Sequence, residues 1–199
     1  LLSQPSAQSV PDPVRLHNLM ATELSRLQAM LDTDSLESIE EFELADVVEP
    51  IVLSHRLAGG VVDTNLGPVR AIGRPQATAT ALANLLENVR SHAPGASATI
   101  RAEHCGSTIV LAVEDNGGGI AASERERVLL RGARGSTPAP GSGLGLYLAA
   151  TAMASQSGTL RLSERKGGGT RAVLTLPAAT RSAAAHLAFP VALRARAAS

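Results

Sequence analysis

Three glycine-rich runs follow one another along the chain, and they limit what the chain can fold into and bind. They read DNGGG at residues 115–119, GSGLG at 141–145 and GGGT at 167–170. Glycine lets the backbone adopt positive φ and approach a ligand closely, so a single run is compatible with an ordinary turn. Three runs, the second leading into a predicted helix, favour a site for phosphate groups. The second run has no Gly-Lys-Ser/Thr after it and follows no strand, which excludes a P-loop and a dinucleotide fingerprint.

Composition excludes several classes of function. The 18 basic and 18 acidic residues leave no net charge, which argues against a nucleic-acid partner because such proteins cluster excess positive charge. The single cysteine, Cys105, excludes an internal disulfide and a cysteine-based zinc site. No apolar run of about 18 residues and no leader peptide are visible, so we expect this segment to be cytoplasmic and to make no membrane contact. The chain begins at Leu1 rather than Met, as a piece of a longer protein would.

Hydrophobic periodicity predicts a series of helices and strands. Helices are predicted over residues 14–31, 44–57, 74–92, 121–130 and 144–155. Strands are predicted over residues 61–65, 69–72, 98–103, 108–114, 159–163 and 171–176. We expect an acidic linker at 32–43, a mobile loop at 131–142 and an Ala/Arg-rich tail without assigned function after Pro177. The pattern of hairpins with helices between them predicts an α/β fold: a two-layer sandwich with helices on one face of a mixed, mostly antiparallel sheet, preceded by one amphipathic helix.

The predicted helix at 74–92 carries a polar stripe. Asn84, Asn88 and His92 are spaced four residues apart, about a quarter turn from a face of leucines. Amide oxygens are suitable ligands for a hard cation such as Mg²⁺. The alternative is a solvated helix face, although two asparagines in mid-helix reduce helix stability.

These motifs resemble the catalytic, ATP-binding domain of sensor histidine kinases, which belong to the GHKL or Bergerat-fold ATPases. The resemblance rests on NLLEN at 84–88 followed by His92 and Pro94, VEDNGGGI at 113–120, GSGLGLYLA at 141–149 and GGGTRAVLTLP at 167–177. It implies a Bergerat-type α/β sandwich over residues 44–177, with ATP held between helices and sheet beneath a mobile lid. Residues 1–43 would then be a lead-in, a remnant of a dimerisation hairpin and a linker, and residues 178–199 a tail.

The resemblance also implies roles for individual residues. Asp115 matches the aspartate that reads the adenine amine, where guanine would present an oxygen; a turn-forming aspartate is the alternative. Asn88 matches the Mg²⁺ ligand. Asn84 takes the place of a glutamate that activates water in hydrolysing relatives, and because an amide accepts no proton at neutral pH, we expect slow hydrolysis. Glu87 is either a catalytic base or an exposed helix carboxylate. The other residues expected to contact ATP are Asn84, His92, Gly117, Gly119, Arg134, Gly141, Ser142, Gly143, Leu144, Gly145 and Thr170.

A histidine kinase also needs a phosphoacceptor histidine on a helical hairpin that forms a homodimer, and it passes the phosphate to a response regulator. One predicted helix precedes residue 44, and its His17 is followed by Asn18 rather than by an acid. We therefore expect the chain to bind Mg-ATP but to form little phosphohistidine unless a partner supplies the acceptor.

Two alternatives use the same fold. The first is a serine kinase of the anti-sigma type, against which Asn84 argues because that class has glutamate there. The second is an interaction module that binds nucleotide without catalysis. The acid lability of phosphohistidine separates the first alternative from a histidine kinase.

Overall fold

A computed structural model describes residues 38–133 and 143–179. The predicted helix at 14–31 with His17, most of the predicted lid with Arg134, Gly141 and Ser142, and most of the tail lie outside the described residues. The chain divides into two compact units, Leu1–Ser38 and Ile39–Ser199, and all of the described helices and strands belong to the second.

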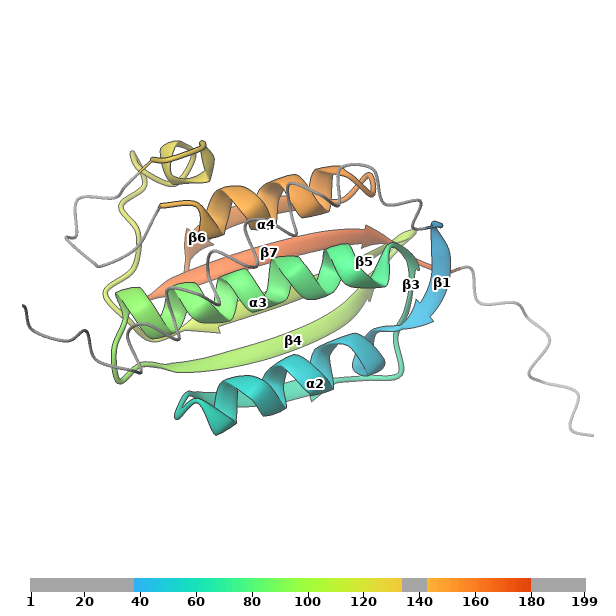
Figure 1. Cartoon of the computed structure of the whole chain (residues 1–199), viewed down its shortest axis with the longest axis horizontal. Helices are drawn as coiled ribbons and strands as arrows, with labels where there is room; N and C mark the ends of the chain where they lie inside the picture. The colour runs from blue at the N-terminus through green and yellow to red at the C-terminus, as the bar shows by residue number, and fades with distance from the viewer. Residues whose placement is uncertain (1–37, 134–142, 180–199) are drawn as a thin grey trace, which may run out of the picture. The chain divides into compact units, whose positions relative to one another are not determined.

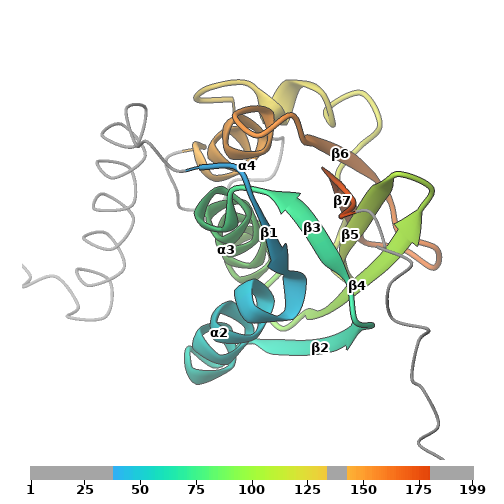
Figure 2. The same ribbon diagram turned by 90° about the vertical axis from the view of Figure 1, so that its right-hand side faces the viewer.

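Within the described residues, three α-helices lie side by side on one face of a five-stranded sheet (Figures 1 and 2). The helices are α2 (Leu44–Leu57), α3 (Pro75–His92) and α4 (Gly145–Ala154). The strands of this sheet are β2 (Val61–Leu66), β4 (Ser97–Cys105), β5 (Thr108–Asp115), β6 (Thr159–Glu164) and β7 (Thr170–Pro177), in the spatial order β2-β4-β5-β7-β6. The predicted α/β sandwich is therefore confirmed, and none of the described helices is long and apolar enough to cross a membrane.

The sheet is mixed, as predicted. Strand β2 runs parallel to β4, whereas β4–β5, β5–β7 and β7–β6 are antiparallel pairs. Glu114 pairs with Arg171, and this register places the next residue, Asp115, beside Thr170 at the first position of β7. The C-terminal end of β5 therefore lies beside the N-terminal end of β7.

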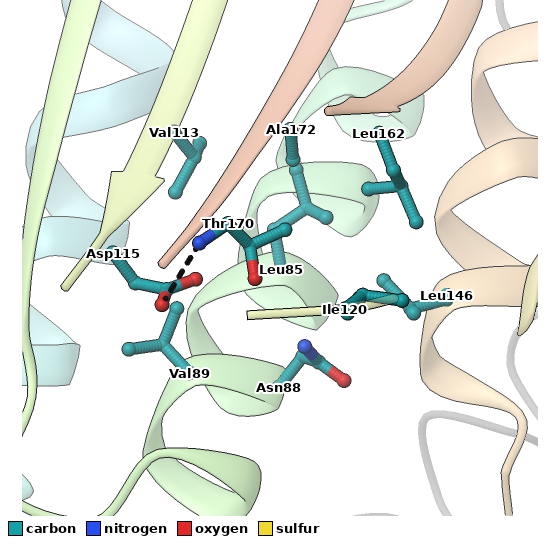
Figure 3. A pocket seen from close by; sticks show the side chains of 10 residues that line it. All are labelled: Leu85, Asn88, Val89, Val113, Asp115, Ile120, Leu146, Leu162, Thr170 and Ala172. Carbon is teal, nitrogen blue, oxygen red and sulfur yellow. Dashed lines mark hydrogen bonds between the residues drawn. The ribbon is translucent and has the colours of Figure 1, made fainter. Parts of the chain in front are cut away.

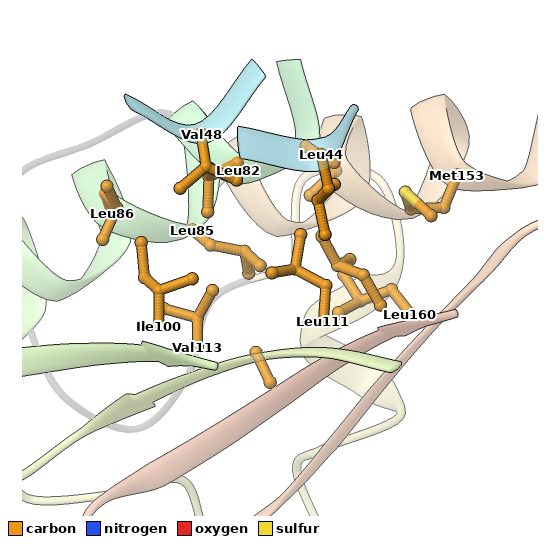
Figure 4. Close-up of a cluster of buried hydrophobic side chains, with 14 of the residues drawn as sticks. Leu44, Val48, Leu82, Leu85, Leu86, Ile100, Leu111, Val113, Met153 and Leu160 are labelled. Atoms are coloured by element: carbon orange, nitrogen blue, oxygen red, sulfur yellow. The ribbon is translucent and has the colours of Figure 1, made fainter. Parts of the chain in front are cut away.

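Within the part of the chain that the structure describes, a hydrophobic core fills the space between the two layers (Figure 4). Alternation along β5 points Ile109, Leu111 and Val113 toward the helices, because successive side chains of a strand point to opposite faces. Helix α3 supplies its leucine face to the same core through Leu82, Leu85, Leu86 and Val89. Full burial of each large aliphatic side chain contributes about 1.5–3 kcal/mol to folding. This core holds α3 rigidly above the ends of β5 and β7.

The expected linker at 32–43 is wrong in its last residues, because Glu40–Glu43 form strand β1. It pairs antiparallel with β3 (Arg70–Gly73) in a separate two-stranded sheet. Phe42 of β1 is buried, and Arg70 forms ion pairs with Glu41 and Glu43 across the two strands. One apolar residue among glutamates gives no strand pattern in the sequence, so the pairing depends on these contacts to β3.

Two residues after Pro177 also belong to the folded unit. The N–H of Ala178 donates to Ser107 O at 2.9 Å, and the N–H of Ala179 donates to Arg70 O at 3.0 Å. Ala178 forms an antiparallel bridge with Ala71, which is itself the partner of Phe42 in β1. The described C-terminal end is thereby connected to the small sheet that begins the unit.

The helix predicted over 121–130 is also wrong. The structure has turns there and one short 3-10 helix, η2 (Arg127–Leu129). The backbone bonds mix spacings: Glu124 N–H reaches Ala121 O, three residues back, whereas Val128 N–H reaches Glu124 O, four residues back. Val128 is buried against the core, while most of its neighbours in the segment are charged or exposed. A short segment without a continuous apolar stripe receives too little tertiary packing to hold a regular helix.

Candidate functional site

A small pocket lies where α3, the start of α4 and the ends of β5 and β7 come together (Figure 3). Its walls are mostly aliphatic, with Asp115, Asn88 and Thr170 as the polar residues. The cavity measures about 10 Å³, close to the space that a single water molecule occupies. The lining residues are Leu85, Asn88, Val89, Val113, Asp115, Ile120, Leu146, Leu162, Thr170 and Ala172.

Asp115 is the buried acid of this pocket, with 6% of its surface exposed. Its Oδ1 accepts hydrogen bonds from the backbone N–H of Gly117 at 2.8 Å and of Thr170 at 3.3 Å. None of the hydrogen bonds found among the described residues uses Oδ2. Two backbone donors thus fix the carboxylate through one oxygen, which leaves the other to accept a hydrogen bond from a ligand.

The first and third glycine runs pack against each other around Asp115. A side chain at Gly117 would contact Ala93 and would lie 3.0 Å from Asp115 Oδ1. Gly119 has φ of +75°, and a side chain there would lie 3.2 Å from Gly169 O. Gly169 has φ of +99°, and a side chain there would overlap the backbone carbonyl of Asp115. At Gly119 and Gly169 glycine is required because backbone meets backbone, and at Gly117 because Ala93 and the Asp115 carboxylate leave no room for a side chain.

The polar stripe on α3 is divided between different surroundings. Asn88 lines the pocket. Asn84 donates from Nδ2 to Thr80 O at 2.8 Å, and a Cβ added at Gly145 would lie 3.5 Å from Asn84 Oδ1. His92 is exposed and borders a second, open hollow of about 420 Å³, formed with residues 93–96 and 116–118. The structure therefore places Asn84 beside Gly145 and Asn88 in the pocket, whereas His92 and Gly117 border the second hollow.

Glu87 is engaged by its own helix. Its carboxylate accepts hydrogen bonds from Arg90 Nε at 2.8 Å, Arg90 Nη2 at 2.6 Å and Ser91 Oγ at 2.7 Å. These hydrogen bonds raise the pKa of the Arg90 guanidinium. Glu87 is not among the residues that line the pocket. It acts electrostatically on His55 of α2 instead, and its role as a base stays a prediction.

His55 has a pKa below its ordinary value. Partial burial is the main cause, since it disfavours the imidazolium; Glu87 opposes the shift and Arg90 adds to it. The His55 ring packs over Gly60, and the N–H of Gly60 donates to His55 O at 2.9 Å.

The second glycine run forms the beginning of α4. Gly143 has φ of +67°, Leu144 is the N-cap residue and the helix starts at Gly145. Among the described residues no side-chain cap is found at this end, and the first N–H groups of a helix, together with the helix dipole, favour an anion. Thr170 is buried, and its N–H is one of the two donors to Asp115. The described part of the chain therefore places Asn88, Asp115, Gly117, Gly119, Gly143, Leu144, Gly145 and Thr170 around one region.

Sequence reasoning missed the aliphatic walls of the pocket. Val113 and Ala172 lie on the inward face of β5 and β7, and Leu85 and Val89 belong to the leucine face of α3. Their hydrophobic periodicity predicted that these residues are buried, but it could not show that they line a pocket, because core residues and pocket walls have the same pattern. Ile120 and Leu162 gave no separate signal. The described residues contain no cluster of three or more His, Cys, Asp or Glu that could hold a metal ion.

Comparison with known proteins agrees with this geometry. Residues 73–180 match the family described as histidine kinase-, DNA gyrase B-, and HSP90-like ATPase. The sensor-like histidine kinase SenX3 of Mycobacterium tuberculosis is 33% identical over 176 residues, 82% of this chain and 42% of SenX3. The sensor-type histidine kinase PrrB of the same organism is 30% identical over 190 residues, 86% of this chain and 42% of PrrB. This chain thus spans about two fifths of the length of these curated relatives.

Solved structures show the same fold. The mycobacterial sensor histidine kinase MprB superimposes with a TM-score of 0.62 and 26% identity, over 71% of this chain and 98% of that one. The ATP-binding domain of PrrB from M. tuberculosis gives a TM-score of 0.58 at 24% identity, again over 71% of this chain and 98% of the other, which supports the fold alone.

Proposed function

Because this chain belongs to the family of histidine kinase-, DNA gyrase B- and HSP90-like ATPases and carries the ATP-binding catalytic domain of a sensor histidine kinase, we propose that it binds Mg-ATP and transfers the γ-phosphate to a histidine. The acceptor lies on a dimerising helical hairpin. The phosphohistidine then serves a response regulator, and the reaction takes place in the cytoplasm.

The observation that carries the proposal is the state of Asp115. A buried carboxylate bound through Oδ1 by two backbone N–H groups keeps Oδ2 for an external donor. An exocyclic amine on a flat ring satisfies that oxygen, and the aliphatic walls from Val89, Val113 and Ala172 suit the faces of the ring. Adenine has such an amine where guanine has an oxygen, so the site favours ATP over GTP.

The phosphates are assigned to the start of α4. The backbone N–H groups at the start of α4 and the positive end of the helix dipole suit an anion. Gly145 lies next to Asn84 of α3. Asn88 follows Asn84 by about one helical turn, so both asparagines are near the start of α4. The Asn88 amide oxygen fits Mg²⁺, a cation that binds one or two protein oxygens and takes its other ligands from phosphates and water. Bound there, Mg²⁺ would neutralise phosphate charge.

The pocket must widen to admit a base. Its present volume suits about one water molecule, so the side chains of Ile120, Leu146 and Leu162 have to move apart when nucleotide enters. Ile120 belongs to the loop before η2, and Leu146 belongs to α4. The segment 134–142 between these two elements contains the other predicted phosphate contacts, Arg134, Gly141 and Ser142.

The residues around the phosphates suit transfer to a protein better than hydrolysis. Asn84 has no basic atom with which to take a proton from water, and Glu87 is occupied by Arg90 and Ser91. In the transfer, an imidazole nitrogen forms the bond to the γ-phosphorus while the bond from phosphorus to the β–γ bridging oxygen breaks and ADP leaves. The chain's part is to hold the nucleotide in line for this attack.

A labelling experiment tests the proposal. The 199-residue chain is incubated with Mg²⁺ and γ-labelled ATP, alone and with a partner chain that supplies a dimerising hairpin with its histidine. We expect label on the partner that is lost in acid and kept in base, and little label on the chain alone. Acid-stable label would instead indicate a serine kinase. Strong self-labelling that His17→Gln abolishes would place the acceptor in this chain.

A further inference from the structure

Gln156 is a buried polar residue that the nucleotide site does not include. It follows the C-terminal end of α4 and has 2% of its surface exposed. A buried amide reduces stability unless its donors and acceptor are paired. Gln156 is paired across the fold: its partners Arg74 and Thr78 lie 82 and 78 residues earlier in the chain, at the start of α3.

The three residues form a closed ring of hydrogen bonds. The backbone N–H of Arg74 donates to Gln156 Oε1 at 2.6 Å. Gln156 Nε2 donates to Thr78 Oγ1 at 3.1 Å, and Thr78 Oγ1 donates to Arg74 O at 3.2 Å. Arg74 is the N-cap position of α3, which has no side-chain cap of its own. The ring therefore connects the end of α4 to the first turn of α3.

The other end of α4 meets the middle of α3. A Cβ at Gly145, the first residue of α4, would lie 3.5 Å from Asn84 Oδ1 and 3.9 Å from Asn84 O. Since the end of α4 lies at Arg74 and Thr78 and its start lies at Asn84, the two helices run antiparallel. Apolar packing between the two helices has no directional preference, whereas the ring around Gln156 joins them through hydrogen bonds of fixed direction.

We infer that Gln156 is a positioning residue for the phosphate end of the nucleotide site. By fixing α4 along α3, it keeps Gly143–Gly145 at the level of Asn84 and Asn88. The base end is held differently, since Asp115 is fixed by Gly117 and Thr170 from β5 and β7. Loss of the ring should therefore weaken binding of the phosphates more than binding of the base. This inference rests on the proposed nucleotide function.

The test compares Mg-ATP with adenosine, which carries the base without phosphates. Affinities are measured by nuclear magnetic resonance titration of the 199-residue chain. For Gln156→Leu we expect about a tenfold loss of affinity for Mg-ATP and less than a threefold loss for adenosine. The matched control is Val62→Ala, which damages the same core at β2, away from the α3–α4 contact, and should leave the ratio of the two affinities unchanged.

A conservative variant separates positioning from general loss of packing. In Gln156→Glu, a neutral carboxylic acid both accepts from Arg74 and donates to Thr78, whereas the carboxylate only accepts. Burial favours the neutral acid, so the ratio of ATP to adenosine affinity should recover toward the wild-type ratio as the pH falls from about 8 to about 5.5. Thr78→Val opens the ring while keeping the side-chain shape, and should reproduce the effect of Gln156→Leu.

The outcomes are distinct. An equal loss of both affinities in Gln156→Leu and Thr78→Val, or the same change of ratio in Val62→Ala, would overturn the positioning role while leaving the proposed function intact. A Gln156→Glu ratio that stays at the Gln156→Leu value at every pH would also overturn it. A wild-type chain that binds neither adenosine nor Mg-ATP would overturn the proposed function together with this inference.

Discussion

The carboxylate of Asp115 accepts a hydrogen bond from the backbone N–H of Gly117, two residues later, at 2.8 Å. This bond closes a small loop at the end of β5 and turns the side chain toward the pocket. It also separates the roles of the two carboxylate oxygens, since Oδ1 serves the fold and Oδ2 is left for a ligand. Replacing one carboxylate oxygen by an NH₂ group, as in Asp115→Asn, therefore tests the two roles separately.

Asp115→Asn should lose nucleotide affinity without losing the fold. The asparagine oxygen can still accept from Gly117 and Thr170, but its NH₂ group then faces the adenine amine, donor against donor. We expect ATP affinity to fall roughly 10- to 100-fold, about 1.5–3 kcal/mol for a hydrogen bond to a charged group, and the preference over GTP to shrink. Calorimetry measures both. Asp63→Asn on exposed β2 is the control, and unchanged ATP affinity in Asp115→Asn would contradict adenine reading.

Asn88→Ala tests the cation. Removal of an amide ligand should reduce the gain in ADP affinity that Mg²⁺ provides, by about five- to tenfold, while metal-free ADP binding changes little. Titrations with Mg²⁺ and with a chelator give the two affinities. Asn65→Ala on exposed β2 is the matched asparagine control. If binding falls equally with and without Mg²⁺, Asn88 contributes to the pocket wall and not to the metal.

Gly117→Ala and Gly118→Ala form a matched pair within one glycine run. A Cβ at Gly117 meets Ala93 and lies 3.0 Å from Asp115 Oδ1, whereas a Cβ at Gly118 meets nothing within 4 Å. We expect Gly117→Ala to lower the free energy of unfolding by about 1–3 kcal/mol, the usual range for overpacking, and Gly118→Ala to change it by less than about 0.5 kcal/mol. Urea denaturation measures both. Equal effects would show that the loop adapts freely.

His55 should make folding stability depend on pH. The folded state lowers the pKa of His55, mainly through burial, so below the ordinary value of 6.5 the unfolded chain binds more protons than the folded one. The stability that neutral His55 contributes is fully present above pH 6.5, and it is lost as the pH falls through the pKa of His55 in the folded state. Urea denaturation from about pH 8 to about pH 5 should show a shallower pH slope in His55→Gln than in wild type. Equal pH slopes in wild type and His55→Gln would contradict this prediction.

The sequence predicted elements that carry their own periodic pattern. Helix α2 has the predicted bounds, and α3 begins one residue later than predicted because Arg74 is its N-cap. Strand β1 was missed because Phe42 stands among glutamates, and its stability comes from the pairing with β3. Residues 121–130 contain enough helix formers to suggest a helix, but too few buried side chains to keep one.

For the candidate site, local motifs indicated Asp115, Asn88 and the glycines, since these residue types serve a recognisable chemistry at fixed spacing. Local spacing could not show that Glu87 is held by Arg90 and Ser91, or that His92 borders a different hollow from Asn88. Gln156 gave no signal, because its partners Arg74 and Thr78 are distant in sequence. Such contacts between remote elements become visible only after the chain has folded.

The hydrogen bonds of Ala178 and Ala179 determine where this domain can be cut. A fragment of residues 44–177 would lose β1, together with the donors to Ser107 O and Arg70 O, and would expose Ala71, which lies between Phe42 and Ala178. A fragment of residues 39–179 would keep every one of these pairings. The fragment of residues 39–179 should therefore melt at a higher temperature than the shorter fragment of residues 44–177.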